Sequence, residues 1–160
     1  MSAVVRVPAI PIGGGCQCGR VRYSLSGFPL VFYLCHCMEC QRHTSSAFGE
    51  SLRVNAADMT VEGELAVFAR VAESGARREG RFCPNCGVRI FHGTEGSAEV
   101  NIKAGTLDDT SWLRPAGHIW TRSRQAFLRW DDADALVYET QPDDGYAALK
   151  RRWRVMIAQS

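Results

Sequence analysis

The chain has 160 residues, of which 46% are hydrophobic and 22% are charged. These proportions are those of an ordinary soluble globular domain, and they exclude a long disordered or fibrous protein. A formal net charge of +2 gives no global attraction to nucleic acid or to an anionic membrane, so neither is expected as a partner. Residues 1–12 contain no sustained apolar run, so we expect no signal peptide, no membrane-spanning helix and a cytoplasmic location. One domain over residues 1–160 is expected.

Short alternating apolar runs bounded by glycine, proline or aspartate predict a mainly β protein. The expected strands cover residues 21–25, 30–34, 48–54, 65–71, 88–92, 98–103 and 117–120. The glycines at 13–15 are expected to form a sharp turn before the first cysteines. Near the C-terminus, apolar residues at helical spacing predict an amphipathic helix over about 143–158, capped by Asp143 or Asp144.

Seven cysteines fall in three clusters, at 16–18, 35–40 and 83–86. Short spacings of this kind are typical of zinc sites, because they bring pairs of thiolates together at little loop-closure cost. Disulfides are the alternative. The odd number of cysteines and the closeness of Cys16 to Cys18 count against it. Two zinc ions per chain are therefore expected.

The spacing divides the cysteines into a group of four and a group of three. Cys16, Cys18, Cys83 and Cys86 are expected to hold a structural zinc, since Gly87 after the last pair permits the left-handed turn of a zinc knuckle. Cys35, Cys37 and Cys40 are then left as three ligands, which leave a fourth position open. A purely structural role for both ions is the alternative.

His36 lies between two of these three cysteines. In an extended segment its side chain should point away from the metal, where it would contact the substrate, relay a proton or simply pack in the loop. Three thiolates make zinc a weak Lewis acid, so activation of water is not its natural use. Binding a further thiol as a nucleophilic thiolate fits better and indicates sulfur chemistry.

The chain resembles the glutathione-dependent formaldehyde-activating enzyme family, which includes centromere protein V. The resemblance covers about residues 14–130, including later segments at 105–109 and 118–124. It is carried by these motifs: Gly14-Gly15-Cys16-Gln17-Cys18-Gly19, Cys35-His36-Cys37-Met38-Glu39-Cys40-Gln41-Arg42, Ser46-Ala47-Phe48-Gly49 and Arg81-Phe82-Cys83-Pro84-Asn85-Cys86-Gly87. Ser45 stands where the family usually has glycine, and Phe127 stands where tryptophan is common.

The resemblance implies coiled β-sheets like those of the exchange chaperone Mss4, held by two zinc ions divided as above. It also implies a carbon–sulfur lyase that combines formaldehyde with glutathione to give S-hydroxymethylglutathione. In this hypothesis Cys35, Cys37, Cys40 and His36 carry the catalysis. Phe48 and Gly49 line the substrate pocket, and Arg42 or Arg124 pairs with substrate carboxylates.

Two other classes of function stay open. One is a carrier that binds glutathione, another thiol or zinc without turnover through the same open position. The other is a zinc-knuckle interaction module, suggested by the basic residues between Lys150 and Arg154. Without basic and aromatic residues arranged for base stacking, a nucleic-acid partner is not expected.

Overall fold

The structure is a computed structural model that describes residues 4–72 and 74–158. Contacts within the chain group these residues into two compact units, which are described separately. The first unit contains residues 4–7, 30–51 and 111–158, and the second contains residues 8–29, 52–72 and 74–110. Strand β4, Gly49–Asn55, begins in the first unit and ends in the second. The expectation of a single domain stays a prediction.

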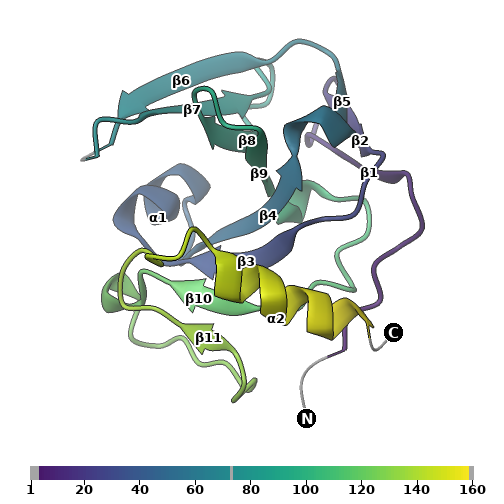
Figure 1. Cartoon of the computed structure of the whole chain (residues 1–160). Coiled ribbons are helices and arrows are strands. Elements are labelled where there is room, and N and C mark those ends of the chain that lie inside the picture. The colour runs from purple at the N-terminus through teal and green to yellow at the C-terminus, as the bar shows by residue number, and fades with distance from the viewer. Residues whose placement is uncertain (1–3, 73, 159–160) are drawn as a thin grey trace. The chain divides into compact units, whose positions relative to one another are not determined.

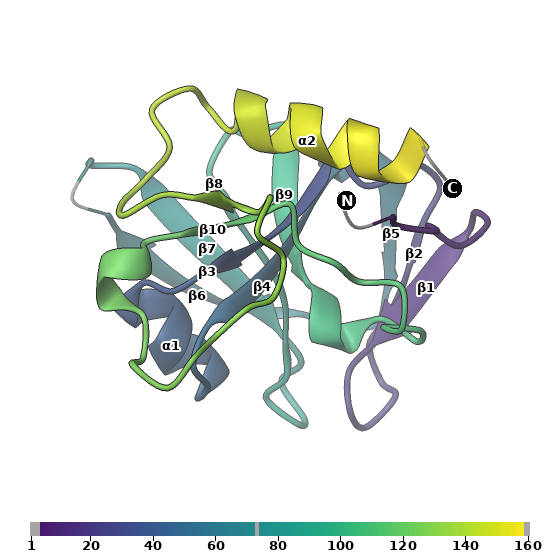
Figure 2. The same ribbon diagram turned by 90° about the horizontal axis from the view of Figure 1, so that it is seen from below.

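The first unit is built on parallel strands. Strand β10, Gly117–Ile119, pairs in parallel with β3, Val31–Cys35, on one side and with β11, Leu136–Val137, on the other. Helix α1, Met38–Thr44, follows β3 directly, and a one-turn helix, Thr121–Ser123, follows β10 closely. Helix α2, Ala147–Ala158, lies against β3, as Figures 1 and 2 show.

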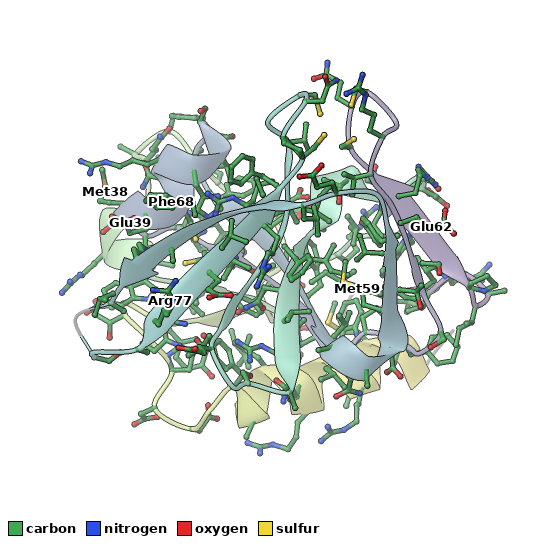
Figure 3. The ribbon with its side chains drawn as sticks, turned by 90° about the horizontal axis from the view of Figure 1, so that it is seen from above. Met38, Glu39, Met59, Glu62, Phe68 and Arg77 are labelled. Atoms are coloured by element: carbon green, nitrogen blue, oxygen red, sulfur yellow. The ribbon has the colours of Figure 1, made fainter. Side chains whose placement is uncertain are left out.

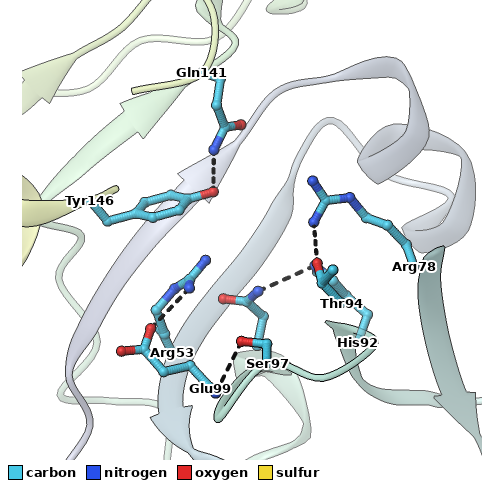
Figure 4. A network of polar contacts seen from close by, with 9 residues as sticks. Arg53, Arg78, His92, Thr94, Ser97, Glu99, Gln141 and Tyr146 are labelled. Atoms are coloured by element: carbon cyan, nitrogen blue, oxygen red, sulfur yellow. Dashed lines mark hydrogen bonds and ion pairs between the residues drawn. The ribbon is translucent and has the colours of Figure 1, made fainter. Parts of the chain in front are cut away.

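The core of the first unit forms between β3 and α2. Leu149, Trp153 and Met156 of α2 are completely buried, and the ring of Trp153 lies 6.4 Å from that of Trp112. Tyr33 stacks on Tyr146 just before α2, and Gln141 donates a hydrogen bond to the Tyr146 hydroxyl (Figure 4). These packing contacts fix the position of β3 and of Cys35 at its end.

The second unit is antiparallel. Strands β1, Ile12–Gly15, β2, Arg22–Leu25, and β5, Met59–Glu62, form one sheet in that order. In the other sheet, the end of β4 is followed by strands β9, β8, β7 and β6, in that order. Their bounds are Ala66–Val71 for β6, Arg77–Phe82 for β7, Arg89–Thr94 for β8 and Glu99–Lys103 for β9. One-turn helices at Ala56–Asp58 and Ala104–Thr106 complete the unit.

Polar pairs link neighbouring strands of the second unit. Arg53 donates to Glu99 at 3.0 Å, and Arg78 donates to the Thr94 hydroxyl at 2.8 Å (Figure 4). On β7, Glu79 accepts hydrogen bonds from Arg77 and Arg81, which lower the pKa of its carboxyl; Figure 3 marks Arg77. Residues two apart share one face of a strand, so this charged stretch forms a solvated strand surface.

The prediction of a mainly β fold with a C-terminal helix is confirmed. Each expected strand is present within one or two residues at its ends, whereas β1, β5, β7 and β11 were not expected. The helix begins at Ala147 instead of 143, because Gly145 and Tyr146 have positive φ angles that interrupt it. Asp144 still accepts a hydrogen bond from the Ala148 amide and so caps the helix.

Candidate metal centres

Cys16, Cys18, Cys83 and Cys86 come together in the second unit, with their sulfur atoms all within 4.8 Å of one another. The Sγ atoms of Cys16 and Cys18 are 3.5 Å apart, and those of Cys18 and Cys83 are 3.7 Å apart. These separations are too long for disulfides and suit thiolates that share one ion. We call these residues the four-cysteine group.

Two similar turns build the four-cysteine group. Gly19 follows the first cysteine pair with φ of 80°, and Gly87 follows the second with φ of 78°. The Gly87 amide donates to the Cys83 carbonyl at 2.8 Å, and the Val21 amide donates to the Cys16 sulfur at 3.3 Å. An amide that points at a sulfur stabilises the thiolate and fixes its direction.

The glycines before the first cysteines do not make the expected sharp turn. Gly13, Gly14 and Gly15 lie within β1, and none of them has a positive φ. A Cβ atom on Gly14 would collide with the Tyr23 side chain and with the carbonyl of Thr106 at 2.6 Å. Glycine is needed there because neighbouring chain segments pack closely, and the turn itself is made at Gly19.

Cys35, Cys37 and Cys40 come together in the first unit, again with all sulfur atoms within 4.8 Å. Cys35 ends β3, Cys40 lies in the first turn of α1, and Cys37 caps this helix by accepting from the Cys40 amide at 3.3 Å. Hydrogen bonds from the Cys35 and Cys40 thiols and from this amide hold the pKa of Cys37 far below its usual range. This three-cysteine group therefore favours a thiolate, which is the form that binds a metal.

Gly49 packs against Cys40 of the three-cysteine group. A Cβ atom at this position would be 3.0 Å from Cβ and 3.1 Å from Sγ of Cys40. The expected pocket residue is therefore a packing residue for a cysteine. Arg42 is exposed on α1, where the labelled Met38 and Glu39 of the same helix also project (Figure 3).

His36 is 1% exposed and points to His118 of β10, whose Nδ1 lies 3.0 Å from His36 Nε2. Burial lowers the pKa of both imidazoles to about 4, and the nearby Arg124 contributes. Both rings are thus neutral near pH 7, and one ring donates to the unprotonated nitrogen of the other. Nδ1 of His36 is buried without a hydrogen-bond partner.

A cavity of about 380 Å³ adjoins this histidine pair. His36, His118, Phe48 and Trp130 form its aromatic wall, and the rings of His118 and Trp130 stack at 3.8 Å. The remaining lining residues are Leu34, Arg114, Pro115, Leu128, Arg129, Asp131 and Asp132. Of the expected substrate contacts, Phe48 and His36 line the cavity, whereas Gly49, Arg42 and Arg124 do not; the Arg124 guanidinium lies over the Trp130 ring, 5.1 Å from its centre.

Several residues of this cavity were missed in the sequence, above all His118 and Trp130. His118 lies in one of the motifs that carry the family resemblance, but that signal gave no role for its side chain. Its partner His36 is 82 residues away, and only the parallel pairing of β10 with β3 brings the two rings together.

The fold and the cysteines define a mainly β protein with two sites that can hold metal ions. Residues 11–123 match the family described as glutathione-dependent formaldehyde-activating enzyme. Since the match covers more than half of the chain, the protein belongs to this family.

A solved structure supports the fold independently. The crystal structure of a Rhodobacter sphaeroides protein, a Northeast Structural Genomics target, aligns with a TM-score of 0.50 and 20% identity. The alignment covers 62% of this chain and 90% of the other, and it shows the fold alone. No curated protein matches the chain significantly. Within residues 4–72 and 74–158, no helix has the length and apolar character required to cross a membrane.

Proposed function

We propose that this protein is a zinc-dependent carbon–sulfur lyase that forms or cleaves an adduct between a thiol and an aldehyde, such as S-hydroxymethylglutathione. One observation carries the proposal. In the chain, His36 stands between Cys35 and Cys37 of the three-cysteine group, and its ring also forms a wall of the 380 Å³ cavity. A site for a thiol sulfur and a space for the rest of the substrate are thus neighbours. Family membership supports this chemistry.

The cysteines fit zinc in both groups. The four-cysteine group offers a complete set of thiolate ligands, as in a structural site, whereas the three-cysteine group offers three. Cys35, Cys37 and Cys40 would hold the second ion, which would stabilise a substrate sulfur as a thiolate at neutral pH. We therefore assign one structural ion and one ion at the reaction site. Because these thiols must stay reduced, the cytoplasm is the expected location.

The cavity suits a zwitterionic thiol. Glutathione carries two carboxylates and one ammonium group, and the cavity is lined by Arg114, Arg129 and Asp131. Guanidinium groups bind carboxylates with two parallel hydrogen bonds. In this proposal these arginines take the role that the sequence suggested for Arg42 or Arg124, which are exposed and do not line the cavity.

The chemistry requires one proton for each adduct formed. The thiolate sulfur attacks the carbonyl carbon, the electron pair of the carbonyl double bond moves to oxygen, and this oxygen takes up a proton; cleavage is the reverse. The hydrogen-bonded His36 and His118 rings, both neutral near pH 7, are suitably placed to pass that proton on through their N–H groups. The unpartnered Nδ1 of His36 supports this role, because a buried nitrogen without a partner costs free energy that a bound group would recover.

Cys37→Ser tests the assignment, with Met38→Ser as its matched control. Met38 is the next residue and 51% exposed, so both variants place serine in the same turn. We expect Cys37→Ser to bind one zinc instead of two and to lose at least about 100-fold in adduct formation from glutathione and formaldehyde. Met38→Ser should keep both. An active Cys37→Ser variant would contradict the mechanism.

A thiol carrier is the second candidate, because the same cavity and cysteines would serve it. Cobalt substitution followed by glutathione titration distinguishes the readings. A saturable change in the spectrum of one cobalt site, without any acceleration of adduct formation or cleavage, would favour the carrier.

An interaction module has less support, since Arg152 in the basic segment is half-buried and paired with Asp132 at 2.8 Å. Binding to nucleic acid that weakens steeply with salt would revive it.

A further inference from the structure

Gln41 follows Cys40 directly, and its amide side chain makes three hydrogen bonds. Its Nε2 donates to the backbone carbonyls of His36 and Ser123, each at 2.9 Å. Its Oε1 accepts from Nε2 of Gln125 at 3.1 Å. All four residues belong to the first unit. One side chain therefore connects the turn that carries the cysteines to the segment after β10.

These bonds act on the peptide that joins two of the cysteines. The His36 carbonyl, which Gln41 holds, lies between Cys35 and Cys37 in the chain. The His36 amide on the other side donates to the Ile119 carbonyl at 3.0 Å. The backbone between the two cysteines is thus tied at both polar groups to residues 119–123, which fixes the directions in which Cys35 and Cys37 leave it.

We infer that Gln41 is a positioning residue that sets the metal affinity of the three-cysteine group without being a ligand itself. The inference rests on the proposed zinc at this group. Only an amide satisfies all three partners, because two of them are acceptors and one is a donor. A carboxylate at the same position would face two carbonyl oxygens and would have no hydrogen to donate.

The test measures metal affinity directly. Wild-type protein and the Gln41→Glu variant are loaded with cobalt, and both centres are titrated against a competing chelator while the thiolate-to-cobalt absorption is recorded. We expect Gln41→Glu to bind cobalt about 10–100-fold more weakly at the three-cysteine group. The absorption of that centre should also change, while that of the four-cysteine group stays the same. Gln125→Met, which removes only the donor to Gln41, should give a smaller loss of the same sign.

Two controls separate positioning from general effects. Gln17→Glu makes the same change at an exposed residue between Cys16 and Cys18, and it should leave the three-cysteine group unaltered. Leu149→Ala removes a fully buried side chain from α2 and should lower thermal stability without changing either cobalt spectrum. If Gln41→Glu fails to fold, Gln41→Met, which has similar length and no charge, takes its place.

The outcomes distinguish this inference from the proposed function. A wild-type protein that binds no cobalt at the three-cysteine group would overturn both the proposed function and this inference. Two bound ions with an unchanged affinity and spectrum in Gln41→Glu would overturn the role of Gln41 alone. A Gln41→Glu variant that only loses thermal stability, as Leu149→Ala does, would show that the glutamine merely packs the loop.

Discussion

The two cysteine groups are assembled in different ways. The four-cysteine group joins two turns that are far apart in the chain, since even their nearest members, Cys18 and Cys83, are separated by 65 residues. The three-cysteine group comes from one short stretch, residues 35–40, between a strand and a helix. An ion in the first group would close a long loop of chain, whereas an ion in the second would close almost none. We therefore expect the first group to govern stability and the second to govern chemistry.

The largest effect should come from Cys83→Ser. Loss of one ligand leaves three thiolates and opens the link between the two turns, so the free energy of unfolding should fall by at least about 4 kcal/mol. Urea unfolding measures it, together with the zinc content. Cys35→Ser is the matched control in the other group, and its loss should be clearly smaller. Equal losses would remove the distinction between the two groups.

An intermediate effect is expected for Gly49→Ala. The new methyl group would meet Cβ and Sγ of Cys40 at 3.0 and 3.1 Å, which costs roughly 1–3 kcal/mol and displaces a ligand. Metal affinity should fall at the three-cysteine group only. Gly93→Ala, which meets Val100 at 3.2 Å and no cysteine, is its control. If both variants weakened metal binding equally, crowding in general would be the cause.

The smallest effect concerns the ion pair of Arg22 and Asp108 near the four-cysteine group. Arg22 donates to both carboxylate oxygens, at 2.8 and 2.5 Å, and lowers the pKa of Asp108. Its stabilisation is therefore present above the ordinary aspartate pKa and is lost as the pH falls through the lower folded-state value. Because the two side chains are 45% and 55% exposed, Asp108→Asn should cost only about 0.5 kcal/mol at pH 7.

Unfolding of wild-type protein and Asp108→Asn between pH 3 and pH 7 tests this last expectation. The difference should shrink toward the acid end and in high salt. A loss above about 1 kcal/mol at pH 7 would mean that the four-cysteine group depends on this surface pair.

The three cysteine clusters could be predicted from the sequence because the spacing within each is local information, and the two distant pairs could then be joined because Cys35, Cys37 and Cys40 form a contiguous set of their own. Within each cluster, the cysteines that can share one ion are separated by only one or two residues. The pairing of His36 with His118 depends instead on which strands become neighbours, and no local pattern reports that. The close packing of Gly14 against Tyr23 follows from the register of β1 on β2 in the same way.

The charged residues of β7 are the reason why the sequence pattern did not predict this strand. Residues 77–82 contain Arg77, Arg78 and Arg81, and the apolar pattern of the sequence predicts no strand there. In the structure Glu79 lies between Arg77 and Arg81 on one face and neutralises part of their charge. Pairing with β6 on one side and β8 on the other then supplies the stability that strand propensity did not suggest.

Gly19 and Gly87 are required for their backbone conformation and not for lack of space. Nothing lies within 4 Å of the position that a Cβ atom would occupy at either glycine, so a larger side chain has ample room. Both residues nevertheless have φ near +80°, which an L-amino acid adopts only with strain and a D-amino acid adopts readily. A chain made by chemical ligation with D-alanine at position 87 should therefore fold and bind metal as the natural chain does. The same chain with L-alanine at position 87 should bind metal more weakly.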